Sequence, residues 1–214
     1  GFFKGVEETQ LSKFWPYVFG GGMDLKSSEV EKYSDLMSES QHLVAADTLA
    51  AVNIPSVCRF LDVGGGKGTF VSELKKIYPK VDAAVFDLPG SHSETSGHRC
   101  IIGSFKEDEL PAGYDIISLV RILYDHRDET IKDLLGKAYR ALDKGGRLIV
   151  SEPMLGADRP TLWGDVYFAM YTLAMSTGKT RSPDQVSGFI KDAGFSNVTI
   201  HKSARPFITT VIEA

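Results

Sequence analysis

A glycine-rich turn is the first stretch of this chain whose residues suggest chemistry. Residues 59–70 read R-F-L-D-V-G-G-G-K-G-T-F, an apolar strand that runs into glycines and then into a helix. Glycine has no Cβ and adopts positive φ readily, so the backbone at Gly64, Gly66 and Gly68 can turn sharply and lie bare against a ligand. A glycine-rich turn alone is weak evidence, but this one, followed by a helix start, predicts a site for a nucleotide-like cofactor.

Two acidic residues lie close to this turn in the sequence. Asp87 follows the apolar residues 81–86, and an acid at the end of a strand can accept hydrogen bonds from both ribose hydroxyls. That arrangement serves NAD and S-adenosylmethionine alike. Three features favour S-adenosylmethionine: Asp62 inside the strand before the glycines, the spacing G-G-G-K-G in place of G-x-G-x-x-G, and no second nucleotide-binding half downstream.

The composition limits the classes of protein to which the chain can belong. It has 214 residues, 43% of them hydrophobic, enough for one main domain with a small helical appendage. The net charge of -4 argues against a nucleic-acid partner. No apolar run is long enough to span a membrane and no signal peptide is apparent, so we expect a cytoplasmic protein. Cys58 and Cys100 lie in apolar runs, and we expect two buried thiols and no disulfide.

Strands alternate with helices from residue 59 onward, and this alternation predicts a parallel sheet with right-handed crossovers. The last two strands are separated by a short basic turn, so they should form an antiparallel hairpin. The turn at 143–146 should introduce the strand before them. We expect strands at 59–63, 81–87, 100–102, 114–120, 146–151, 198–201 and 207–212, and helices at 69–78, 129–142, 163–175 and 182–193.

The first 53 residues form a helical and aromatic segment. Residues 1–23 mix aromatic side chains with a triple glycine, which suggests a connector packed on the core or a lid over a substrate pocket. Apolar residues at helical spacing predict a helix over 27–52, capped by Ser27 or Ser28. We therefore assign 1–53 to a connector or lid and 54–214 to the cofactor-binding domain, and we expect residues upstream of Gly1.

Several motifs together resemble those of the class I S-adenosylmethionine-dependent O-methyltransferases that act on small molecules, over nearly the whole chain. The resemblance implies an α/β, Rossmann-like fold with a mainly parallel seven-stranded sheet and a C-terminal antiparallel hairpin. Two narrower motifs, F-W-P-Y-V and V-R-I-L-Y-D-H-R-D, are most similar to bacterial carotenoid enzymes, the hydroxyneurosporene and demethylspheroidene O-methyltransferases. The broader motifs are L-D-V-G-G-G-K-G (61–68), F-D-L-P (86–89), A-L-D-K-G-G-R-L-I-V-S-E-P (141–153), G-K-T-R-S (178–182) and D-A-G-F (192–195).

The resemblance also implies a set of cofactor contacts. The family usually has Asp under the adenine amino group, in G-D-x-F, whereas this chain has Gly103-Ser104-Phe105, so that hydrogen bond is weaker or comes from elsewhere. Relatives carry an N-terminal dimerisation domain, so the resemblance implies a homodimer through a domain of which only the tail could be present here. The implied cofactor residues are Asp62, Gly64, Gly65, Gly66 and Gly68 around the methionine part, Asp87 and Leu88 at the ribose, Ser104 and Phe105 near the adenine, and Arg121 beside sugar and base.

The largest departure from the family is catalytic. Its L-H-D-W motif supplies a histidine base, whereas residues 123–126 read L-Y-D-H, with Tyr124 at the base position and His126 at the tryptophan position. Glu152 matches one of two acids that assist that histidine, and Thr180 replaces the other. We take Tyr124, His126 and Glu152 as candidate catalytic residues. An imidazole is the better proton acceptor and a tyrosine can orient a hydroxyl, but His126 could equally stack under adenine or lie on the surface.

The acceptor predicted from these residues is large and apolar, such as a hydroxylated carotenoid, and a peripheral membrane contact is compatible with it. Alternatives are O-methylation of a phenol, C-methylation of a tetrapyrrole, an NAD-dependent oxidoreductase, or a cofactor-binding protein without catalysis. Asp125, His126 and Asp128 lack a distant partner, so we expect no metal site. The expected pocket residues, about half of which should be ordinary core, are Phe14, Trp15, Tyr17, Met37, Trp163, Tyr167, Phe168, Met170, Tyr171 and Met175.

Overall fold

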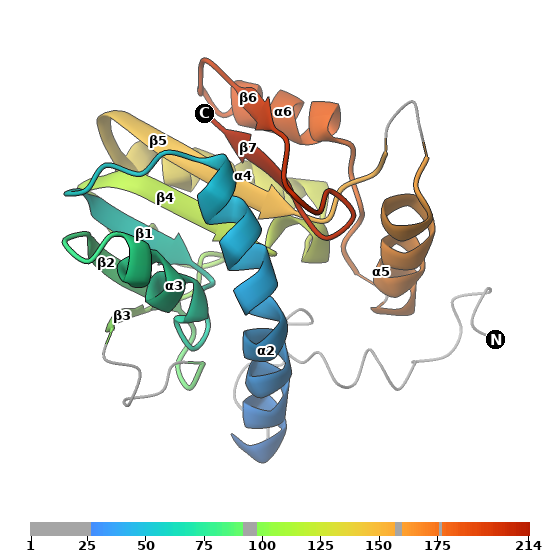
Figure 1. Cartoon of the computed structure of the whole chain (residues 1–214), viewed down its shortest axis with the longest axis horizontal. Coiled ribbons are helices and arrows are strands. Elements are labelled where there is room, and N and C mark those ends of the chain that lie inside the picture. The colour runs from blue at the N-terminus through green and yellow to red at the C-terminus, as the bar shows by residue number, and fades with distance from the viewer. Residues whose placement is uncertain (1–26, 92–97, 157–159, 176) are drawn as a thin grey trace.

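The computed structural model of the protein describes residues 27–91, 98–156, 160–175 and 177–214, with side chains from residue 38 onward. Seven strands form one sheet in the order β3-β2-β1-β4-β5-β7-β6 (Figure 1). The first five in that order are parallel, and β7 runs antiparallel to both of its neighbours. The predicted α/β fold, with its mainly parallel sheet and closing hairpin, is therefore confirmed. The strands are β1 Arg59–Val63, β2 Asp82–Asp87, β3 Arg99–Ile102, β4 Tyr114–Val120, β5 Leu142–Glu152, β6 Thr199–His201 and β7 Thr210–Glu213.

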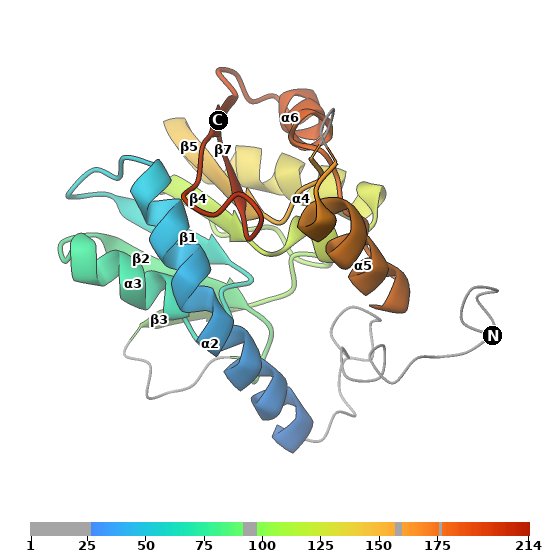
Figure 2. The same ribbon diagram turned by 45° about the vertical axis from the view of Figure 1, so that its right-hand side comes forward.

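Helices cover both faces of the sheet. Helices α2 and α3 lie on one face and α4 and α6 on the other, while α5 lies apart near the carboxyl ends of the strands (Figures 1 and 2). The carboxyl end of β4 leads into a short 3-10 helix, η3, and a π-helical segment, η4, precedes α5. The bounds are α2 Ser27–Ala51, α3 Thr69–Ile77, η3 Leu123–Asp125, α4 Asp128–Ala141, η4 Leu162–Phe168, α5 Ala169–Met175 and α6 Pro183–Asp192.

The sheet separates two apolar cores. On the α4 and α6 side Leu61 and Val63 of β1 are fully buried, and on the α2 and α3 side Phe60 packs against Phe70 with ring centroids 6.1 Å apart. Because the central strands are covered on both faces, they read as continuous apolar runs and not as alternating ones. Val44 and Leu49 of α2 belong to the second core, so the C-terminal half of this helix packs on the sheet.

The last strand was predicted to begin at residue 207, but residues 206–208 form a turn and β7 begins at Thr210. Two other predicted boundaries were wrong in an informative way. β5 begins at Leu142, because Tyr114 pairs with Leu142, but the next pair joins Ile116 to Arg147, so residues 143–146 pair with no residue of β4. The predicted turn is therefore present as a bulge inside the strand, in which Gly145 has a φ of 82°. The helix predicted at 163–175 begins as the π-helix η4 and becomes α-helical only at Ala169.

Smaller expectations were mostly confirmed. Ser182 caps α6 in a reciprocal capping box, in which its hydroxyl accepts from Gln185 N at 3.2 Å and its own N–H donates to Gln185 Oε1 at 3.0 Å. Cys58 is buried and both thiols are free, but Cys100 is only half-buried because β3 is the edge strand. Among the described residues, no helix has both the length and the apolar character needed to cross a membrane.

Candidate active site

The glycine turn has the backbone conformation that the sequence predicted. Gly64, Gly66 and Gly68 have φ of 71°, 54° and 78°, and Gly64 N donates to Phe86 O at 2.7 Å, which ties the turn to the end of β2. A Cβ on Gly64 would overlap Ile122, whereas a Cβ on Gly66 would meet no atom of the described residues within 4 Å. Among these residues the backbone at Gly66 therefore faces open space, as a cradle for a ligand requires.

Asp87 lies at the carboxyl end of β2, directly beside this turn. Its Oδ2 accepts from Gly66 N at 2.7 Å and its Oδ1 accepts from Leu88 N at 2.6 Å. These two bonds orient the carboxylate of Asp87 at the turn. The ribose role of Asp87 stays a prediction, and the geometry is compatible with it.

Asp62 lies beneath the turn and is 1% exposed. Its Oδ1 accepts from Ser118 Oγ at 2.6 Å, while its Oδ2 is buried without a hydrogen-bond partner among the described residues and would overlap a Cβ on Gly65. Burial raises the pKa of Asp62 to about 7; the hydrogen bond from Ser118 opposes this shift and the charge of Asp87 adds to it. A buried carboxyl oxygen without a donor at this point suits a donor or cation supplied by a ligand.

The raised pKa of Asp62 predicts a pH-dependent stability. An unfolded Asp loses its proton near pH 4 and the folded one near pH 7, so the folded state binds more protons in between and stability falls as pH rises through this window. Asp62→Asn should remove about 2 kcal/mol of the fall in unfolding free energy between pH 5.5 and pH 8. Urea unfolding at the two pH values measures this difference. An equal fall in unfolding free energy in the wild type and in Asp62→Asn would contradict the raised pKa of Asp62.

Glu152, at the end of β5, holds the main chain that follows β4. Its Oε1 accepts from Ile122 N at 2.8 Å and Leu123 N at 2.7 Å, and its Oε2 lies 3.5 Å from Tyr124 N. Glu152 is 2% exposed, and burial raises its pKa to about 7 although these N–H groups oppose the shift. The structure therefore places Glu152 as the acceptor that shapes residues 122–126, which we call the η3 loop.

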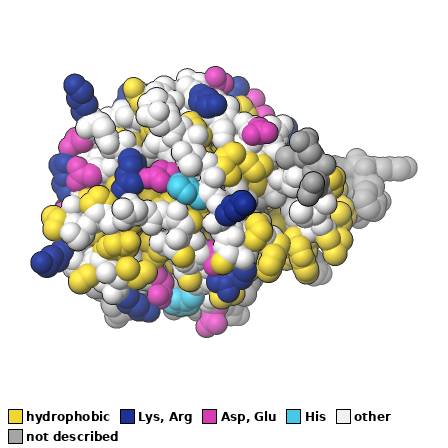
Figure 3. Space-filling model, turned by 45° about the horizontal axis from the view of Figure 1, so that its top comes forward, with side chains coloured by type: hydrophobic (Ala, Val, Ile, Leu, Met, Phe, Trp, Pro, Cys, Tyr) yellow, Lys and Arg dark blue, Asp and Glu magenta, His cyan; other side chains and the backbone are white. Residues whose placement is uncertain are grey.

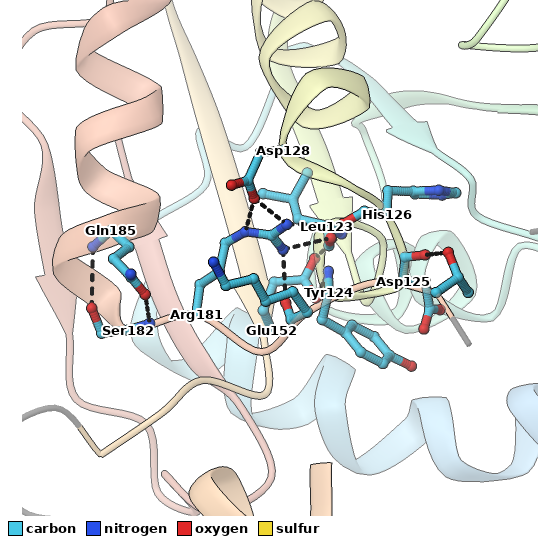
Figure 4. Close-up of polar contacts among 11 residues, drawn as sticks. Leu123, Tyr124, Asp125, His126, Asp128, Glu152, Arg181, Ser182 and Gln185 are labelled. Atoms are coloured by element: carbon cyan, nitrogen blue, oxygen red, sulfur yellow. Dashed lines mark hydrogen bonds and ion pairs between the residues drawn. The ribbon is translucent and has the colours of Figure 1, made fainter. Parts of the chain in front are cut away.

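Tyr124 and His126 leave the η3 loop in different directions (Figure 4). Tyr124 is 4% exposed, and its ring lies 6.0 Å from that of Phe168 and 6.1 Å from that of Tyr171. Burial, and then the charge of Asp125, raises the pKa of Tyr124 well above its ordinary value. This phenol therefore stays protonated and can donate a hydrogen bond, but it is a poor base.

His126 is 9% exposed, so the surface alternative for this residue is wrong. Its ring meets that of Phe105 edge to face at 5.2 Å, which joins two parts of the predicted site. Burial lowers the pKa of His126 to about 4, helped by the positive charges of Lys106 and Arg181. The imidazole is neutral at pH 7 and only weakly basic.

Comparison with known proteins now identifies the family. A family model described as an O-methyltransferase domain matches residues 3–196. The chain belongs to the O-methyltransferase domain family. Across the whole chain this domain is 46% identical to the demethylspheroidene O-methyltransferase of Rhodobacter capsulatus and 43% identical to that of Cereibacter sphaeroides.

Solved structures agree with this assignment. Human N-acetylserotonin methyltransferase, solved in complex with SAM, matches the whole O-methyltransferase domain with a TM-score of 0.82 at 25% identity, over 61% of that chain. The domain spans 55% and 59% of the two bacterial relatives, somewhat more than half of their length.

Two further cofactor candidates have partners that the sequence did not reveal. Arg121, at the end of β4, donates from Nη1 to Ser40 Oγ at 2.8 Å and to Gln41 Oε1 at 3.4 Å, so it links the domain's sheet edge to α2. Ser104 N donates to Asp108 Oδ2 at 2.8 Å. The family motif G-D-x-F has its Asp at the position of Ser104. In this chain Asp108, four residues later in the sequence, places a carboxylate beside that position.

Apolar residues along one face of η4 and α5 line an open hollow of about 730 Å³, and five of them are 44 to 67% exposed. Figure 3 shows apolar side chains gathered over these elements. Phe168 and Tyr171 connect this region to Tyr124. Met175 is 1% exposed and belongs to the core. Phe14, Trp15, Tyr17 and the side chain of Met37 lie outside the described residues. The hollow is lined by Leu162, Trp163, Val166, Tyr167, Met170, Tyr171 and Ala174.

No group of three His, Cys, Asp or Glu side chains in the described ranges is arranged to hold a metal ion.

The most important residue that sequence reasoning missed is Arg181. It is 3% exposed, and its guanidinium lies against the η3 loop. The only sequence signal was its place in the motif G-K-T-R-S, because a single arginine is ordinarily assigned to the surface.

Proposed function

We propose that this protein transfers a methyl group from S-adenosylmethionine to a hydroxyl of a large apolar acceptor, a hydroxylated carotenoid of the demethylspheroidene type. The observation that carries the proposal is the glycine cradle above the unpartnered Asp62 oxygen, on an O-methyltransferase domain that has an apolar hollow nearby. The acceptor class rests on the two relatives with 46% and 43% identity. The seven lining residues carry no charge, which favours a polyene over a small polar phenol.

The residues present fit this cofactor. Asp62 would accept from the amino group of the methionine part, and Asp87 would accept from the ribose hydroxyls. Gly66 would let the ligand lie against bare main chain. When bound, the cofactor supplies a methyl group already activated by a sulfonium.

The protein's own task is then mainly alignment, because well-oriented reactants lose much of the barrier through positioning alone. We propose that Tyr124, which stays protonated, orients the acceptor hydroxyl and that Glu152 fixes the η3 loop. His126 and Phe105 would form a wall beside the adenine. This is the stacking alternative, and it is supported by the low pKa of His126 and by its direction away from Tyr124.

His126→Ala tests that assignment. If His126 is part of the adenine wall, affinity for S-adenosylhomocysteine should fall about 10-fold, the size of one lost aromatic contact, while kcat at saturating cofactor changes by less than about threefold. Calorimetric binding and steady-state turnover measure the two quantities. Normal affinity with a kcat reduced about 100-fold or more would instead make His126 the general base.

The cofactor class has a simple test. S-adenosylhomocysteine should raise the melting temperature of the protein and NAD should not, because a ligand stabilises only a state that binds it. Stabilisation by NAD alone would support an oxidoreductase. The homodimer through an N-terminal domain, the division at residue 53, the cytoplasmic location and the peripheral membrane contact stay predictions; size-exclusion chromatography of the full-length protein tests the first.

A further inference from the structure

The carbonyl side of the η3 loop is bound by one short segment, residues 177–181. Lys179 N donates to Tyr124 O at 2.9 Å, and Thr177 Oγ1 donates to Asp125 O at 3.3 Å. Arg181 binds both ends of the loop, with Nη1 donating to Leu123 O at 3.2 Å and Nη2 to His126 O at 2.9 Å. Figure 4 shows Arg181 beside the loop residues Leu123 and His126. Each of these four carbonyl groups therefore has a donor from the same segment.

Arg181 uses its whole hydrogen-bonding capacity in this contact. Besides the two loop carbonyls it donates from Nη1 to Lys179 O at 2.7 Å, and from Nε and Nη2 to Asp128 Oδ1 at 2.9 and 2.6 Å. A guanidinium has five N–H donors in a rigid fork, and all five are engaged. Asp128 begins α4, so one buried cation joins the 177–181 segment, the η3 loop and the start of α4.

We propose that Arg181 is a positioning residue for methyl transfer, an inference that rests on the proposed function. It binds the carbonyls of Leu123 and His126, which enclose Tyr124. Glu152 binds the N–H groups on the opposite side of the same loop. With both sides fixed, Tyr124 is directed toward Phe168 and Tyr171, and His126 is directed toward Phe105. Arg181 therefore helps to fix the orientation of Tyr124, on the proposed acceptor side of the site, relative to His126, on the proposed cofactor side.

Arg181→Lys and Asp128→Asn form a matched pair of variants. Lysine keeps the charge, but its ammonium has three donors on one nitrogen, so it cannot replace the five hydrogen bonds that the guanidinium fork of Arg181 makes. Asn at 128 weakens the ion pair and leaves the carbonyl contacts of Arg181 intact. Turnover is measured with labelled cofactor and expressed per site that binds S-adenosylhomocysteine, so unfolded protein does not count.

We expect kcat to fall about 10- to 100-fold in Arg181→Lys, the loss that a displacement of about 1 Å can cause. The fall should be clearly smaller in Asp128→Asn, because the Oδ1 of Asn can still accept from Arg181. Amide hydrogen exchange of residues 122–126 should accelerate in Arg181→Lys only. This second measurement needs no turnover. A failure of the proposed function would appear as no methyl transfer by the wild type. The hydrogen-exchange result tests the role of Arg181 independently of that outcome.

Equal losses of kcat in the two variants, or unchanged exchange of the loop in Arg181→Lys, would overturn the proposal. Arg181→Gln, which keeps donors without the charge, serves as a second variant and should also lose turnover. If neither substitution at 181 yields protein that binds S-adenosylhomocysteine, Arg181 is a residue of general stability and the positioning role is wrong.

Discussion

Gly66→Val should weaken S-adenosylhomocysteine binding by at least about 100-fold, the equivalent of roughly 3 kcal/mol. No atom of the part of the chain that the structure describes lies within 4 Å of a Cβ at Gly66, so the new side chain would occupy the volume proposed for the cofactor. The φ of 54° also disfavours a β-branched residue. Isothermal titration calorimetry measures the affinity, and circular dichroism measures whether the fold is retained.

Gly145→Val is a matched control for that experiment. Gly145 also has a positive φ, 82°, and a Cβ there would also meet no described atom within 4 Å. It lies in the first part of β5, at the opposite end of that strand from Glu152. Both variants should lose a similar amount of stability, about 1 to 3 kcal/mol from backbone strain, and only Gly66→Val should lose binding. Equal affinity in the two variants would show that the cofactor does not lie against Gly66.

Glu152→Ala should lower the free energy of unfolding by roughly 3 kcal/mol, because it leaves the buried N–H groups of Ile122 and Leu123 without an acceptor. Glu152→Gln keeps one carbonyl oxygen and should cost about 1 kcal/mol. Urea unfolding at pH 7 measures both. Should Glu152→Ala lose turnover with its stability unchanged, Glu152 would act in the chemistry and not in the shape of the η3 loop.

Local patterns were sufficient to predict most elements of this fold. The apolar run of residues 114–120 is β4 to the residue, and Ser182, the first residue of the helix predicted at 182–193, is the N-cap of α6. The start of β5 was mispredicted because the glycine pair at 145–146 has the local signature of a turn, while the pairing of Tyr114 with Leu142 continues the strand beyond it. Such pairing between strands distant in sequence cannot be detected from local residue preferences.

The candidate site also combines features that local sequence predicts with features that depend on contacts between residues distant in sequence. Positive φ at Gly64, Gly66 and Gly68 follows from residue type and spacing. The direction of His126 depends instead on Arg181, which follows it by 55 residues, and on contacts to main-chain carbonyls that any residue type can provide. Sequence alone therefore left the base, stacking and surface roles of His126 open, and burial excluded the last of them.

The choice of acceptor is the central claim. A carotenoid offers many methylene-sized groups, each worth about 0.8 kcal/mol when buried, to the apolar hollow over η4 and α5. Binding energy from this remote chain would hold the reacting hydroxyl near Tyr124. Shortening the chain of the acceptor should therefore lower kcat as well as affinity.

The most direct measurement is kcat/KM for methyl transfer from labelled S-adenosylmethionine to a hydroxylated carotenoid and to caffeate, with both acceptors in the same detergent. We predict a kcat/KM at least about 100-fold higher for the carotenoid, equivalent to roughly 3 kcal/mol of transition-state binding from the apolar chain. An equal or higher kcat/KM for caffeate would contradict the apolar-acceptor assignment and leave only a general O-methyltransferase.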